Sequence, residues 1–142
     1  MNKMTRLELC NCFAARQASR HLTKLYERHL ADAEVTSAQF SILVALDDAG
    51  ELTMNELAKA MVMDRTTLLR AIQPLRRQEL VISRPSADDG RRMLLSLSAA
   101  GARRLKKALA LWSNAQQEFE STIGSGEAAR LRRGLLALAR PT

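Results

Sequence analysis

The charged residues best suited to binding chemistry gather around a glycine in the segment RPSADDGRRMLLSLSAAG, residues 84–101. Two aspartates precede this glycine and two arginines follow it. A guanidinium group binds phosphate oxygens through paired hydrogen bonds, so Arg84, Arg91 and Arg92 are candidates for holding a phosphate polyanion. Asp89 can pair with Arg91 or Arg92 and hold the guanidinium at a fixed angle. The alternative is a solvated turn whose charges only keep the protein soluble.

A second group of polar side chains follows Asp64 at helical spacing: Arg65, Thr66, Thr67, Arg70 and Gln73. Arginine can recognise guanine through two hydrogen bonds and glutamine can recognise adenine, so we expect base contacts from Arg65, Arg70 or Gln73. Threonines near a helix N-terminus more often hold phosphates, which is the role expected of Thr66 and Thr67. An ordinary exposed basic helix face is the alternative.

Composition favours a single helical domain with an anionic partner. The 142 residues include few aromatics, 4%, and the net charge is +7. The apolar residues are mainly leucine and alanine, which favours helices packed on helices. The positive charge makes nucleic acid the first partner to consider, although a basic surface without a partner is also compatible with it.

Several classes of protein are not expected. No apolar run approaches the roughly 18–20 residues needed to cross a bilayer, and the N-terminus lacks the apolar stretch of a secretory signal. We therefore expect a cytoplasmic protein without a membrane partner. The sequence contains no nucleophile elbow, no glycine-rich phosphate loop and no paired carboxylates in a helical setting, so neither an enzyme nor a cofactor is expected.

Apolar periodicity and capping residues predict the order of elements. A long helix is expected over residues 7–30, a second after Thr36, a third after the Thr53–Glu56 capping box, and a fourth capped by Asp64. Residues 80–84 and 92–98 are expected to form a β-hairpin, with Gly90 able to take a positive φ at the tip. Two further helices are expected, over residues 99–123 and around Leu131, Leu135 and Leu138.

A helix-turn-helix followed directly by a β-hairpin predicts a winged helix. The second helix of the pair is expected in the DNA major groove, and the hairpin along the backbone or the minor groove beside it. The fold class is therefore mainly α with a small β-hairpin wing.

The chain resembles the MarR-type transcriptional regulators over nearly its whole length. The residues that carry the resemblance are Leu57-Ala58, Asp64-Arg65-Thr66-Thr67-Leu68, Leu75, Leu80-Val81, Asp89-Gly90-Arg91, Leu95-Ser96-Leu97-Ser98 and Gly101. The last three groups match a wing pattern of Asp-x-Arg followed by Leu-x-Leu-Thr-x-x-Gly, with Ser98 in place of threonine.

The resemblance implies one domain, residues 1–142, that forms a homodimer on a pseudo-palindromic double-stranded DNA operator. Residues 1–33 and 99–142 would then be dimerisation helices, and residues 34–98 the winged helix-turn-helix lobe. Such proteins usually repress transcription and are released by a small ligand or an oxidant.

Three residues depart from the expected pattern. Glu79 and Val62 occupy positions where glycine is common, which suggests a locally different turn geometry. Pro74 lies late in the recognition helix and removes the hydrogen bond to the Arg70 carbonyl, so a bend is expected there.

The two cysteines leave several interpretations open. Cys10 and Cys12 are two residues apart on a helix and point about 200° apart, so neither a local disulfide nor a metal site is expected. The pair formed by Cys12 and Tyr26, fourteen residues later, resembles the first-helix cysteine and nearby tyrosine of the organic-hydroperoxide-sensing branch of the family. Arg16, one turn after Cys12, can instead stabilise a thiolate. A small buried hydrophobic residue is the common role of a free cysteine.

The same region offers a second effector hypothesis. Arg16 and Arg20 can grip a small aromatic or anionic effector, such as an aromatic carboxylate, or they can form ordinary surface salt bridges. Among the competing functions, a low-specificity DNA-binding or adaptor protein remains the alternative to a regulator.

Overall fold

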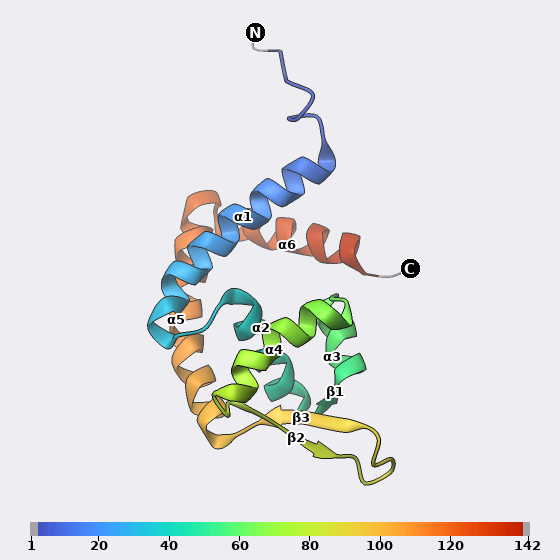
Figure 1. The fold of residues 1–142 in the computed structure, drawn as a ribbon. Helices are drawn as coiled ribbons and strands as arrows, with labels where there is room; N and C mark the ends of the chain where they lie inside the picture. Colours follow the sequence, from blue (N-terminus) through green and yellow to red (C-terminus); the bar gives the residue numbers. More distant parts are fainter. Residues whose placement is uncertain (1–2, 141–142) are drawn as a thin grey trace.

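The computed structural model describes residues 3–140, which form a helical protein with one small sheet (Figure 1). The helices are α1 (Asn11–Leu30), the 3-10 helix η1 (Ala31–Ala33), α2 (Ser37–Ala49), α3 (Met54–Met61), α4 (Arg65–Arg77), α5 (Ala99–Ile123) and α6 (Ser125–Ala139). The strands are β1 (Leu52–Thr53), β2 (Val81–Pro85) and β3 (Met93–Leu97). The mainly α fold with a β-hairpin wing is confirmed.

The 25-residue helix α5 connects the two ends of the molecule. In Figure 1, α1 and α6 lie beside one end of α5, and the lobe of α2, α3, α4 and the sheet lies at the other. Helix α5 contacts α1, α2 and α6. No helix within residues 3–140 has the length and apolar character needed to span a membrane.

Side-chain caps fix where the helices of the lobe begin. Thr36 and Gln39 form a reciprocal capping box on α2, and the Thr53 hydroxyl accepts a hydrogen bond from the Glu56 amide at 3.2 Å. The Asp64 carboxylate accepts one from the Thr67 amide at 2.7 Å, as the sequence predicted. These contacts satisfy amides that the helix itself leaves unpaired.

The first helix is shorter than predicted, because it begins at Asn11 rather than at residue 7. Thr5 and Glu8 bond each other's amides through their side chains, which closes a separate turn. The Cys10 sulfur then accepts a hydrogen bond from the Phe13 amide and caps α1. Leu7 and Leu9 are exposed, so no packing in this chain extends the helix toward them.

The sheet has the strand order β1-β3-β2, and both pairings are antiparallel. The hairpin pairs Val81 with Leu97 and Pro85 with Met93, and the short strand β1, which the sequence did not predict, places Leu52 opposite Leu95. Gly90 does not use the positive φ that was open to it at the tip: among the described glycines, only Gly50 and Gly124 have positive φ.

The turns at Val62 and Glu79 keep the backbone geometry that glycine usually supplies. Their φ angles are 52° and 58°, in the left-handed region. The expectation of a different turn geometry at these positions was therefore wrong. Helix α4 contains Pro74 and continues to Arg77.

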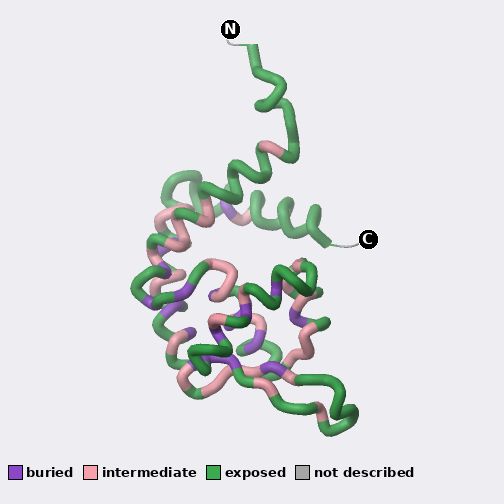
Figure 2. Tube along the Cα trace, in the orientation of Figure 1, coloured by how far each residue is buried: buried purple, intermediate pink, exposed green. Residues whose placement is uncertain are grey.

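The hydrophobic core lies mainly within the lobe and extends to the part of α5 that packs against it (Figure 2). Its largest fully buried side chains include Leu43, Leu46, Leu57, Ile72 and Leu95. On α4 the buried residues are Leu68, Ile72 and Leu75, whereas Leu69 is 40% exposed. Figure 2 shows the start of α1 and most of α6 as exposed chain.

Candidate nucleic-acid interface

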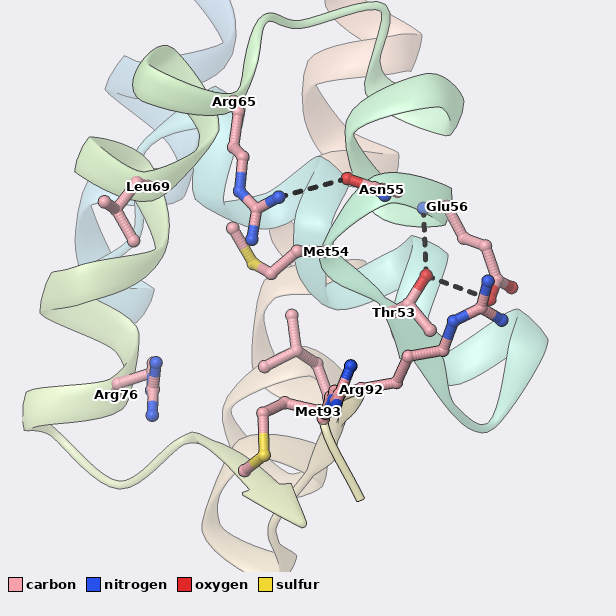
Figure 3. Close-up of a pocket in the computed structure, with 11 residues that line it drawn as sticks. Thr53, Met54, Asn55, Glu56, Arg65, Leu69, Arg76, Arg92 and Met93 are labelled. Atoms are coloured by element: carbon pink, nitrogen blue, oxygen red, sulfur yellow. Dashed lines mark hydrogen bonds between the residues drawn. The ribbon is translucent and has the colours of Figure 1, made fainter. Parts of the chain in front are cut away.

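A cavity of about 530 Å³ separates α4 from the wing. Its lining residues come from β1, α3, α4 and the hairpin: Thr53, Met54, Asn55, Glu56, Arg65, Leu69, Arg76, Arg91, Arg92, Met93 and Leu95 (Figure 3). Four of these are arginines, and the apolar members come from α3, α4 and the hairpin. The cavity therefore combines a positive rim with partly apolar walls, which suits the sugar-phosphate edge of a nucleic acid.

Arg65 lies at the first position of α4 and reaches toward α3. Its Nη1 donates to the Asn55 Oδ1 at 3.4 Å, and Figure 3 shows this bond beside Met54. The helix N-cap directly before it, Asp64, carries a carboxylate whose pKa is lowered, chiefly by the hydrogen bond from the Thr67 amide. The residue that orders the start of the recognition helix thus stays ionised at neutral pH.

The other predicted recognition residues form the outer face of α4. Thr66, Thr67, Arg70 and Gln73 are all exposed, as is Arg65. Within residues 3–140, neither Arg65 nor Arg70 lies within 4.0 Å of a carboxylate oxygen. Their guanidinium charges are therefore available to a ligand.

At the wing tip, Asp89 orders the backbone and does not hold a guanidinium. The Arg91 amide donates to the Asp89 carboxylate at 3.0 Å, and the Arg92 amide donates to the Asp89 carbonyl at 3.0 Å. The predicted pairing of Asp89 with an arginine side chain was wrong: its carboxylate accepts from the Arg91 backbone amide, and no guanidinium of the described residues lies within 4.0 Å of it. Arg91 and Arg92 are exposed and both line the cavity.

Arg84 differs from the tip arginines because its guanidinium already has a partner. Its Nε and Nη2 donate to the two carboxylate oxygens of Glu51, each at 2.7 Å. This pairing lowers the pKa of Glu51 and raises that of Arg84, mainly through the hydrogen bonds between them. The sequence placed Arg84 with the DNA-binding arginines, whereas the structure shows it bonded within the protein.

Three residues of this surface were missed from the sequence: Glu51, Asn55 and Arg76. Arg76 follows Arg65 by eleven residues, close to three full helical turns, so the two arginines share one face of α4 with Leu69. This helical spacing could have placed Arg76 on the same surface as Arg65 from the sequence alone. Glu51 and Asn55 gave none, because their partners lie 33 and 10 residues away.

The predicted effector and redox residues lie on α1, apart from this cavity. Cys10 and Cys12 are both exposed free thiols, so the buried-hydrophobic interpretation does not hold within this chain. Cys12 and Tyr26 lie about 21 Å apart along the helix axis at 1.5 Å per residue, so one chain does not bring them together.

Tyr26 is bonded elsewhere, and its hydroxyl donates to Gln116 of α5. Burial raises the pKa of this phenol, the Glu120 carboxylate adds to the shift, and Arg132 opposes it. Arg16 and Arg20 are exposed, and the described residues include no carboxylate within 4.0 Å of either.

Comparison of this chain with known proteins identifies its family. The family model described as the MarR family matches residues 33–92, from the end of η1 to the residue before β3. The transcriptional repressor NicR of Pseudomonas putida is 34% identical over 116 residues, covering 77% of this chain and 72% of NicR. The chain belongs to the MarR family.

Two further relatives extend the comparison. The organic hydroperoxide resistance transcriptional regulator of Bacillus subtilis is 30% identical over 110 residues, covering 76% of this chain and 75% of that protein. The Mycobacterium tuberculosis regulator MosR, solved in complex with DNA, is 35% identical with a TM-score of 0.82, covering 92% and 93% of the two chains. This MarR-family protein is a DNA-binding transcriptional regulator and not an enzyme.

Proposed function

We propose that this MarR-family protein is a homodimeric repressor that binds a pseudo-palindromic operator. The observation that carries the proposal is that the recognition helix and the wing tip supply arginines to one cavity, Arg65 from α4 and Arg91 and Arg92 from the hairpin. Arginines from two elements around one groove suit contact with a DNA backbone beside an occupied major groove.

In this proposal the exposed face of α4 enters the major groove. Arg65, Arg70 and Gln73 contact base edges, while Thr66 and Thr67 bind phosphates close to the helix N-terminus. Arg91 and Arg92 contact the backbone or the narrow groove beside it. Asp89 supports them by fixing the backbone of the tip.

Dimerisation is supported by apolar side chains that this chain leaves exposed. Leu131, Leu135, Leu136 and Leu138 of α6 are between 43% and 82% exposed, and Leu7 and Leu9 lie before α1 with similar exposure. Apolar groups in such number mark an interaction surface, and a second copy of the chain would cover them. Two copies carry a net charge of +14, twice the +7 of one chain, so binding should weaken steeply with salt.

Selection of genomic DNA fragments from the native host tests this function. The selected fragment should bind about 10³-fold or more tightly than a random duplex of equal length. A ratio near one would instead identify the low-specificity DNA-binding or adaptor protein. The position of the selected fragments relative to promoters would support or contradict repression.

Release by an effector is the second part of the proposal. Cys12 is an exposed thiol, and the Bacillus subtilis relative is named for organic hydroperoxide resistance, which supports an oxidant effector. Arg16 and Arg20 have no acidic partner among the described residues, which supports an aromatic or anionic effector. Titrating the DNA complex with an organic hydroperoxide and, separately, with aromatic carboxylates distinguishes the two.

A further inference from the structure

The base of the wing is bonded to its surroundings on both faces of β2. Ser83 lies on the core-facing side, opposite Leu95, and its hydroxyl accepts a hydrogen bond from Arg76 of α4 at 3.1 Å. Arg84 lies on the other face and makes its two bonds to Glu51. The wing is thus tied to the recognition helix on one side and to the loop before β1 on the other.

The bonds between Glu51 and Arg84 cross the central strand of the sheet. Arg84 pairs with Leu94 of β3, and Leu94 pairs on its other side with Thr53 of β1. Glu51 lies directly before β1, and its carboxylate reaches Arg84 from that edge of the sheet. The ion pair therefore joins the outer strand of the wing to the opposite edge of the sheet.

An ion pair of this kind contributes little to overall stability. The two side chains are 53% and 38% exposed, and water and salt screen the attraction within an exposed ion pair. The bidentate geometry instead fixes an angle between two groups. A negative charge beside a DNA-binding wing would by itself repel the DNA phosphates and weaken binding. We therefore look for the role of Glu51 in positioning the wing.

We propose, resting on the DNA-binding function above, that the Glu51–Arg84 pair is a strap that sets the position of the wing. Arg84 is then a positioning residue and not a phosphate contact. Charge alone predicts that removing the acidic group of Glu51 strengthens DNA binding. The strap predicts the opposite, that its removal weakens DNA binding.

The test measures affinity for the selected DNA fragment as a function of salt, in the full-length protein. Glu51→Gln should weaken binding about two- to fivefold, the range that an exposed ion pair can transmit. Asp88→Asn is the matched control, since it removes an acidic charge from the wing itself and the Asp88 side chain makes no bond in the described residues. That control should bind equally well or more tightly.

Salt dependence separates positioning from phosphate contact. Loss of one phosphate contact lowers the slope of log affinity against log salt by about one, as expected for Arg91→Ala. Arg84→Gln should weaken binding while leaving the slope unchanged, and the double variant Glu51→Gln/Arg84→Gln should be no weaker than Arg84→Gln alone. Tighter binding by Glu51→Gln, or a slope lowered by one in Arg84→Gln, would overturn the proposal.

Amide hydrogen exchange provides a measurement that needs no DNA. Glu51→Gln should speed exchange of the Ser86 amide, which bonds the Arg92 carbonyl at the end of the hairpin, and Asp88→Asn should not. Unchanged exchange in Glu51→Gln contradicts the strap even if the wild-type protein were to bind no DNA. Failure of DNA binding in the wild type alone contradicts the proposed function and not the strap.

Discussion

At the residue scale, the arginines of the candidate DNA-binding surface fall into two groups: those whose guanidinium is bonded within the protein and those without a carboxylate partner. Arg84 is bonded to Glu51, and Arg76 donates to Ser83. Arg70 and the tip arginine Arg91 have no carboxylate partner among the described residues. We therefore propose a structural role for Arg84 and Arg76 and DNA contact for Arg70 and Arg91.

Arg91→Ala should weaken binding to all duplexes by a similar factor, because a wing phosphate contact carries no base information. The salt slope should fall by about one, and the dimer should remain intact. Gel-shift titrations at several salt concentrations measure both. Unchanged affinity would refute the wing role.

Arg70→Ala should instead reduce discrimination between the selected fragment and random DNA. Loss of a bidentate base contact costs about 1–3 kcal/mol at one base pair and little on non-specific DNA. Competition binding with single-base variants of the fragment measures this. An equal loss on specific and random DNA would reassign Arg70 to the backbone.

Cys12→Ser should abolish release from DNA by organic hydroperoxide, if the wild-type complex is released by it. The reason is that the thiolate is the group that an oxidant attacks. Cys10→Ser is the control, although it also alters the cap of α1. Release that persists in Cys12→Ser would reject the oxidant effector.

At the element scale, Ser98 and Gly101 make several contacts where the wing connects to α5. Ser98 caps α5 by accepting from the Gly101 amide at 3.0 Å, and its hydroxyl also bonds the Glu79 carbonyl. Gly101 packs against the backbone of Leu80, and a Cβ built there would lie 2.0 Å from the Leu80 carbonyl oxygen. These contacts fix the helix that connects the lobe to α1 and α6.

Ser98→Ala should lower the free energy of unfolding by about 1–2 kcal/mol, the usual cost of removing a helix N-cap. Ser98→Thr should change it little, because threonine keeps the hydroxyl and is itself a good cap. Urea denaturation compares the three proteins. Equal stability of Ser98→Ala and wild type would contradict the capping role.

Gly101→Ala should destabilise the protein by about 3 kcal/mol or more, because the new methyl group would overlap backbone that α5 cannot easily move away from. Gly126→Ala is the control, since no atom lies within 4 Å of a Cβ built at that position. Thermal unfolding measures both variants, and similar melting temperatures would disprove the close contact.

The sequence predicted most helix starts because their caps are local. Thr53 and Asp64 bond amides three residues later, so their roles follow from spacing alone. The start of α1 was missed because Leu7 has an apolar side chain at helical spacing but nothing in the chain to pack on. Strand β1 was missed because its pairing with β3 joins residues more than 40 positions apart.

At the scale of the whole molecule, the chain has one end that can contact DNA and one end that exposes apolar helix. The winged helix was predictable from element order, because a helix pair followed by a hairpin fits few other arrangements. The Glu51–Arg84 bond was not predictable, since it depends on how the sheet brings distant residues together. The sequence therefore predicted which elements carry the candidate surface, but not which of its arginines bond within the protein.

Two copies related by a two-fold axis would place their recognition helices about 34–36 Å apart, one turn of DNA. In this arrangement α6 and the start of α1 meet the partner, which explains why Leu131 and Leu135 are exposed in one chain. Leu135→Asp should weaken the dimer and with it operator binding. A variant that remains dimeric in analytical ultracentrifugation would exclude this face from the interface.

The most direct measurement is the stoichiometry of the complex with the selected DNA fragment, by sedimentation equilibrium in low-salt buffer. The account predicts two chains for each duplex, with dimers already present in the free protein. A single chain on the duplex, or protein that sediments separately from the DNA, would contradict it.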